Sequence, residues 1–215
     1  HWWLRRAEGE YANGLSLAKR FWNLDAHLDI LSQFGGPGWV ALNGAPTDTE
    51  GELEDVLAHV RGRGHEAALS EVWEKGGEGG LELAEKVLSS MKKANGYHPL
   101  YELGLPLKEK IEKIATHVYG AEGVDYIDSA SAFLEDLEKR GYGNLPVCMA
   151  KTQMSLSDDP GKIGRPKGWR LLVREVRLSA GAGFVVPICG TIMTMPGLPK
   201  RPAAESIDVD DQGRI

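Results

Sequence analysis

Two consecutive units of one kind, each an apolar strand followed by a loop and a helix, constrain the fold of this chain more than any other feature. The strands are expected over residues 39–42 and 67–72, and the helices over residues 50–60 and 81–88. Apolar residues recur at helical spacing in both helices, whereas the strands are short apolar runs bounded by turn residues. Because the helix between two such strands carries the chain back to the same end, the two units predict a parallel sheet.

The rest of the chain adds helices and strands without a further repeat. Helices are expected over residues 24–31, 106–118 and 129–139, and strands over residues 145–150, 171–178 and 184–189. The predicted fold class is α/β, a parallel or mixed sheet flanked by helices, with a C-terminal section of strands and long loops. We expect three parts: a helical lead-in over residues 1–35, an α/β lobe over 36–145 and the strand-and-loop section over 146–215. Residues 1–22 are the least readable stretch.

The charge balance and the lengths of the apolar runs argue against several classes of protein. A formal net charge of -6 disfavours binding of nucleic acid through the overall field, and Asp158 and Asp159 dilute the basic stretch at residues 162–170. No apolar run reaches the roughly 20 residues of a membrane span, and no secretion signal is recognisable. Cys148 and Cys189 lie in apolar runs, as expected of buried reduced thiols, with a disulfide between them left open. We therefore expect a cytoplasmic protein that binds neither nucleic acid nor a membrane.

The parallel sheet predicts where a ligand would bind. In open sheets of this kind ligands lie outside the carboxyl ends of the strands. The loops that follow the two strands bring Pro46 and Trp73 to that edge. The indole ring could stack there on a flat heteroaromatic ligand, the alternative being a tryptophan that belongs to the core. Thr47, Asp48 and Thr49 are expected to cap the helix that follows.

Two loops are further candidates for ligand contact. Gly76, Gly77, Glu78 and Gly79 precede a helix, so they form either an anion-binding backbone or a plain flexible turn. Residues 151–160 are dense in hydroxyl, amide and charged side chains, and form either a binding loop or a loop that bonds its own backbone. No segment has the GxxxxGK[ST] pattern of a phosphate loop. The six histidines show no ligand spacing, so no metal site is expected.

A series of long segments then carries a resemblance to a known family. The segments include VALN at 40–43, PTDTE at 46–50, SEVWEKGGEGGLELAEKV at 70–87, LPLKEKIEKIA at 105–115, VYGAEGV at 118–124, GNLPVCMAKTQMSLSDDP at 143–160 and VREVRLSAGAGFVVPICGTIMTMPGLPKRPAAESIDVD at 173–210. In this order they resemble formate–tetrahydrofolate ligase, also called formyltetrahydrofolate synthetase, over most of residues 23–215. The resemblance is to the C-terminal portion, and because the chain does not begin with methionine we expect it to be a fragment. Residues 1–12 match nothing in this resemblance.

The resemblance implies an activity and its substrates. Members of the family use ATP to phosphorylate formate, and the N10 amine of tetrahydrofolate attacks the formyl phosphate to give 10-formyltetrahydrofolate, ADP and phosphate. The expected small-molecule partners are therefore formate, Mg-bound ATP and tetrahydrofolate, with a monovalent cation as a further candidate. The resemblance also implies a P-loop NTPase-like fold and a homotetramer for the full-length enzyme.

The resemblance also assigns roles to individual residues. Folate is expected between Pro46 and Trp73, with Leu69 lining the same pocket. No catalytic residue is expected in this segment, because the phosphate loop and the formyl phosphate pocket of the family lie in its N-terminal portion. Two departures concern binding: Ala45 stands where the family has an aromatic residue, and Gly38 and Trp39 stand where the family has a strand rich in valine. The alternative is a non-catalytic folate- or purine-binding fragment that lacks the ATP phosphate loop.

Overall fold

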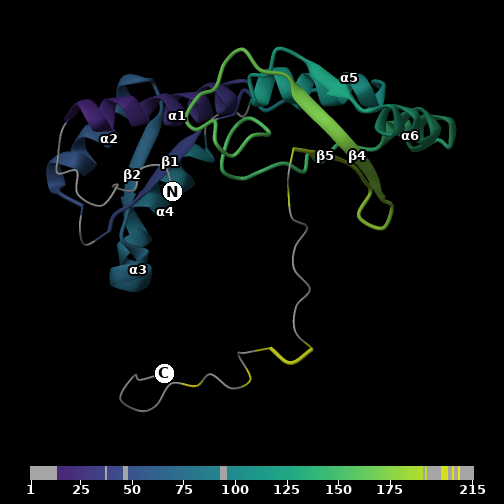
Figure 1. The fold of residues 1–215 in the computed structure, drawn as a ribbon. Coiled ribbons are helices and arrows are strands. Elements are labelled where there is room, and N and C mark those ends of the chain that lie inside the picture. The colour runs from purple at the N-terminus through teal and green to yellow at the C-terminus, as the bar shows by residue number, and fades with distance from the viewer. Residues whose placement is uncertain are drawn as a thin grey trace.

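The structure, a computed structural model, describes residues 14–36, 38–45, 48–92, 96–190, 192, 200–202, 205 and 208. Its elements form two lobes that follow each other along the chain (Figure 1). The first lobe consists of α1 (Gly14–Ser32), β1 (Trp39–Asn43), α2 (Glu50–Gly62), β2 (Glu66–Ser70), α3 (Val72–Lys75), the 3-10 helix η1 (Gly76–Gly80) and α4 (Leu81–Ser90). The second consists of α5 (Leu107–Lys113), the π-helical turn η2 (Ile114–Val118), β3 (Val124–Tyr126), α6 (Asp128–Lys139), the 3-10 helix η3 (Tyr142–Asn144), β4 (Leu171–Ser179) and β5 (Phe184–Cys189).

The described strands form two small sheets. The first pairs β1 with β2 in parallel, in a register that runs from Trp39 opposite Glu66 to Asn43 opposite Ser70. The second has the order β3-β4-β5, with a parallel and an antiparallel pairing. The α/β class with parallel and mixed sheets flanked by helices is therefore confirmed. Strand β3 was not predicted, because three residues are too few to show a period. Its pairing with β4 crosses the boundary expected after residue 145, and the division into three parts stays a prediction.

The first turn of α2 explains why this helix was readable from the sequence. The Oγ1 atom of Thr49 accepts a hydrogen bond from the backbone N–H of Glu52 at 3.3 Å, and the Glu52 carboxylate accepts one from the N–H of Thr49 at 3.1 Å. This reciprocal pair is a capping box, which satisfies two backbone donors at the helix start. One turn further on, Val56 and Val60 are buried, and the helix packs on β2.

The main hydrophobic core lies in the second lobe. It joins residues of α5, α6, β3, β4 and β5, together with the segment before β4. Its members are Leu107, Ile111, Ala115, Ala121, Val124, Ala130, Leu134, Leu137, Val147, Trp169, Leu171, Val173, Val176, Val185 and Cys189. Trp169 is only 4% exposed, so the aromatic residue of the basic stretch belongs to the core rather than to a binding surface.

A lysine lies inside this core. Lys110 on α5 is fully buried, and its ammonium group donates hydrogen bonds to the carbonyls of Gly143 at 2.6 Å and Leu145 at 3.0 Å. Burial lowers the pKa of Lys110, and the charge of Glu138 opposes this effect. The side chain therefore joins α5 to the turn that follows α6.

Two predictions for residues 145–150 are wrong: that they form a strand and that Cys148 is buried. Residues 145–150 do not form a continuous strand; they make two isolated parallel bridges to β5, at Val147 with Val185 and at Ala150 with Ile188. Successive side chains in an extended segment point to opposite sides. Val147 is accordingly buried, while its neighbour Cys148 is exposed. Cys148 and Cys189 are both free thiols, and burial raises the pKa of Cys189 to about 12.

Helix α1 and Gln33, the residue that follows it, join the two lobes. The side-chain amide of Asn23 donates to the carbonyl of Gly164 at 3.0 Å, and that of Gln33 donates to the carbonyl of His117 at 2.8 Å. Between them, Asp29 forms an ion pair with Arg165 at 2.7 Å. The helix runs along the first lobe towards the second (Figure 1), so each of these contacts crosses from one lobe to the other.

Candidate functional site

The carboxyl ends of β1 and β2 lie side by side at one edge of the first sheet. Asn43 and Ser70 are the last pair in the register, and the N–H of Gly44 continues the pairing by donating to the carbonyl of Ser70 at 3.1 Å. The loops that follow β1 and β2, which the sequence predicts as ligand-binding loops, therefore begin next to each other. This is the edge at which open α/β sheets bind their ligands.

The turn after β1 is held by an aspartate. The N–H of Ala45 donates to Oδ2 of Asp48 at 2.8 Å, and the N–H of Asp48 donates to the carbonyl of Ala45 at 2.9 Å. Asp48 therefore shapes the turn, whereas Thr49 is the residue that caps the helix. Pro46 and Thr47 lie outside the described residues.

Leu69 lies beneath this turn. It is the fourth residue of β2 and half-buried. A β-carbon added to Gly44 would lie 3.3 Å from its Cδ1 atom, so the leucine side chain reaches the start of the turn. It supplies apolar surface at the edge where the two loops begin.

Trp73 lies in the first turn of α3, just beyond the end of β2. The sequence suggested that the strand continues to residue 72 and that an open loop follows; instead β2 ends at Ser70 and Val72 begins a helix. Trp73 is 68% exposed, which excludes the core alternative and leaves the indole ring accessible to a flat ligand. Figure 1 shows α3 projecting from the end of the lobe that holds the carboxyl edge of the sheet.

The glycine-rich stretch after Trp73 is not an open loop. It forms the 3-10 helix η1, which leads directly into α4. Gly76 adopts a left-handed backbone with φ of 59°, a conformation in which glycine has no steric penalty. Ligand contact by Gly76, Gly77, Glu78 and Gly79 stays a prediction.

The sequence matches the model of the formate–tetrahydrofolate ligase family over residues 5–215. The chain belongs to this family. The match includes both loops at the carboxyl edge and extends into residues 5–12, which the sequence reading had left unassigned. The formate–tetrahydrofolate ligase family is an enzyme family of ligases, whose members use ATP and tetrahydrofolate as substrates.

A second loop of this ligase chain satisfies its own backbone. The ammonium group of Lys151 donates to the carbonyls of Thr152 at 3.0 Å, Ser157 at 3.2 Å and Ser155, and lies 4.6 Å from the centre of the Tyr119 ring. Burial lowers the pKa of Lys151 to about 8. Of the two interpretations of residues 151–160, these contacts favour a loop that bonds its own backbone over a ligand-binding loop.

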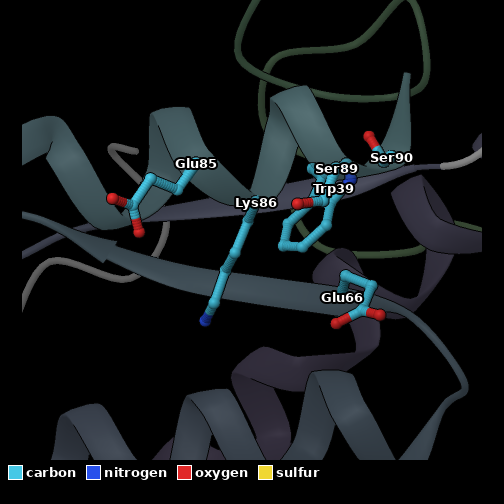
Figure 2. A pocket seen from close by; sticks show the side chains of 6 residues that line it. All are labelled: Trp39, Glu66, Glu85, Lys86, Ser89 and Ser90. Carbon is cyan, nitrogen blue, oxygen red and sulfur yellow. The ribbon is translucent and has the colours of Figure 1, made fainter. Parts of the chain in front are cut away.

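A shallow cavity of about 300 Å³ lies at the opposite end of the sheet (Figure 2). It is formed between α4 and the sheet, and its lining residues are Trp39, Glu66, Glu85, Lys86, Ser89 and Ser90. Trp39 and Glu66 are the first residues of β1 and β2, so the cavity opens at the amino ends of the strands. Lys86 bonds the carbonyl of Ala67 at 3.2 Å and pairs with Glu82 at 2.5 Å. The cavity is therefore separate from the loops that follow the strands.

The described residues of this ligase chain show neither a group of metal ligands nor a membrane-spanning helix. No three histidine, cysteine, aspartate or glutamate side chains gather there as metal ligands. No described helix is long and apolar enough to cross a membrane.

Sequence reasoning missed Asp48 as the residue that shapes the turn after β1. The signal was present, because an aspartate three residues after a turn residue commonly accepts a backbone hydrogen bond.

Proposed function

We propose that this chain forms the folate-binding side of a formate–tetrahydrofolate ligase. The complete reaction consumes ATP and gives 10-formyltetrahydrofolate, ADP and phosphate. The observation that carries the proposal is the position of Trp73, a 68% exposed indole in a family-matched segment at the carboxyl edge of the sheet. An exposed tryptophan at this edge has the shape and accessibility needed to stack on the flat pterin ring.

Three residues would form the platform. Trp73 supplies the stacking face, Leu69 the apolar surface beside the β1 turn, and Pro46 the opposing wall. Ala45 contributes only a methyl group where the family has an aromatic ring, so we expect weaker binding than with an aromatic residue there.

The phosphoryl chemistry is assigned elsewhere in the enzyme. Transfer of a phosphoryl group depends on positive charge and Mg²⁺ placed around the phosphate oxygens. The sequence contains no GxxxxGK[ST] segment, so we propose that the folate platform is the contribution of this chain. A P-loop NTPase-like fold, a homotetramer and a cytoplasmic location belong to the same proposal and rest on the family resemblance.

Titration with tetrahydrofolate tests the proposal. Quenching of tryptophan fluorescence is followed in the 215-residue chain, in Trp73→Ala and in Trp22→Ala. Trp22 is a matched control because it is 67% exposed but lies on α1, which is not part of the two loops that follow β1 and β2. Loss of a stacking ring is worth about 1–3 kcal/mol, so Trp73→Ala should raise Kd by about 5- to 150-fold.

The control decides what a change in quenching means. Saturable quenching that survives in Trp22→Ala and is lost in Trp73→Ala supports the platform. Equal quenching in all three proteins, or no saturation with the folded chain, contradicts it.

A further inference from the structure

The segment from Glu71 to Gly79 is a closed loop whose two ends touch. The N–H of Glu71 donates to the carbonyl of Gly79 at 3.0 Å, across the helical turns of α3 and η1. Trp73 projects from this loop. The position of its ring therefore depends on how the loop closes.

Gly79 makes the closest approach at the closure. A β-carbon added there would lie 2.5 Å from both the carbonyl carbon and the oxygen of Glu71, and 2.9 Å from the backbone nitrogen of Val72. Real β-carbons essentially never come within 3.0 Å of such atoms. Because these neighbours belong to the backbone, a side-chain rotation cannot relieve the contact.

The other glycines of the loop differ from Gly79. Gly76 has a positive φ and open space around it, so its need for glycine is conformational. Gly77 has an ordinary φ and also has open space. Gly80 is intermediate, because an added β-carbon would lie 3.0 Å from the flexible Cγ2 of Val72. The space available for the methyl group of a glycine-to-alanine substitution therefore differs from one glycine of the loop to the next.

The peptide of Glu71 also anchors the helix that carries Trp73. Its carbonyl accepts hydrogen bonds from the N–H groups of Glu74 at 3.1 Å and Lys75 at 2.9 Å. Its carboxylate pairs with the ammonium group of Lys75 at 2.7 Å. A displacement of this peptide would therefore move the first turn of α3, and Trp73 with it.

We propose that Gly79 is a positioning residue that sets the orientation of Trp73 through the close packing of its Cα against the Glu71–Val72 peptide. The proposal rests on the proposed function, because it concerns the ring assigned to folate stacking. It gives Gly79 a role that requires no contact with the ligand. In this role the missing side chain of Gly79 allows close approach rather than binding of an anion.

The experiment compares Gly79→Ala with Gly62→Ala, which adds the same methyl group to open space at the end of α2, outside the loop that carries Trp73. The Kd for tetrahydrofolate is measured by fluorescence quenching in each variant and in combination with Trp73→Ala. We expect Gly79→Ala to raise Kd about tenfold and Gly62→Ala to leave it within about twofold. In the Trp73→Ala background, Gly79→Ala should cause no further loss, because the ring it positions is absent.

A second readout does not depend on binding. The near-ultraviolet circular dichroism of Trp73, taken as the difference between the chain and Trp73→Phe, should change in Gly79→Ala and not in Gly62→Ala. If the chain binds no tetrahydrofolate, the proposed function fails while this signal still decides whether Gly79 positions the ring. If Gly79→Ala does not fold, Gly80→Ala takes its place and should show a smaller change of the same kind.

Two results would overturn the inference. One is an unchanged Trp73 signal in the folded Gly79→Ala and Gly80→Ala variants. The other is a loss of affinity in Gly79→Ala that is equally large with and without Trp73.

Discussion

Replacement of Lys110 by methionine tests whether the buried ammonium group holds the second lobe together. Methionine has a similar length and fills the same space, but it cannot donate to the carbonyls of Gly143 and Leu145. Each hydrogen bond from a charged donor is worth about 1.5–3 kcal/mol, and the relieved desolvation of the ammonium group offsets part of the loss. We therefore expect Lys110→Met to lower the free energy of unfolding by about 2–4 kcal/mol.

The assay is urea unfolding of the 215-residue chain, followed by tryptophan fluorescence. Trp169 lies in the same core and reports on its loss. Lys108→Met is the control: it lies on the same helix, but its ammonium group makes a partly exposed pair with Glu135 at 2.8 Å. Such pairs contribute about 1 kcal/mol or less.

Two outcomes would refute this reasoning. A Lys110→Met variant within about 0.5 kcal/mol of the unmodified chain would show that the two carbonyls find water or other partners. Equal losses for Lys110→Met and Lys108→Met would show that burial of the charge does not decide the effect.

Two further predictions concern Lys151 and the start of α2. Burial lowers the pKa of Lys151 in the folded chain to about 8, below its ordinary value of 10.5, so between about pH 8 and pH 10.5 the unfolded chain binds more protons and stability rises with pH. The chain should therefore become more stable relative to Lys151→Met by about 1–3 kcal/mol in free energy of unfolding between pH 7.5 and pH 10. The control is Lys162→Met, which replaces an exposed lysine. A stability difference between the chain and Lys151→Met that does not change with pH would contradict the lowered pKa of Lys151. Thr49→Ala removes the side-chain half of the capping box with Glu52 and should cost about 1 kcal/mol in thermal or urea unfolding, whereas Thr49→Ser should retain most of it. Equal stability of the two Thr49 variants would contradict the role of the cap.

Local signals were sufficient to predict most helices and strands. The capping residues Thr49 and Glu52 and the helical spacing of Val56 and Val60 all act within a few residues, so α2 is readable without its surroundings. The order of the first two strand–helix units likewise predicted the parallel pairing of β1 and β2.

The remaining features depend on contacts between distant residues. The need for glycine at position 79 comes from the backbone of Glu71, and the burial of Lys110 depends on carbonyls more than thirty residues away. A lysine three residues after Leu107 and four before Ile114, on the apolar face of its helix, was a visible signal, but the sequence does not show which carbonyls would accept its hydrogen bonds. At the candidate site, the adjacency of the two loops followed from topology, whereas the exposure of Trp73 required the structure.

The three contacts of α1 and the adjoining Gln33 with the second lobe affect how the chain could be divided in the laboratory. Among the residues whose burial the structure describes, the first lobe buries the apolar side chains of Leu28, Val56, Val60 and three alanines, whereas the large core belongs to the second lobe. Asn23 and Gln33 hold the junction through neutral amides, so neither salt nor moderate acid would release them. A protein engineer who cut the chain between α4 and α5 would therefore obtain a stable C-terminal piece and an N-terminal piece that depends on its partner for solubility.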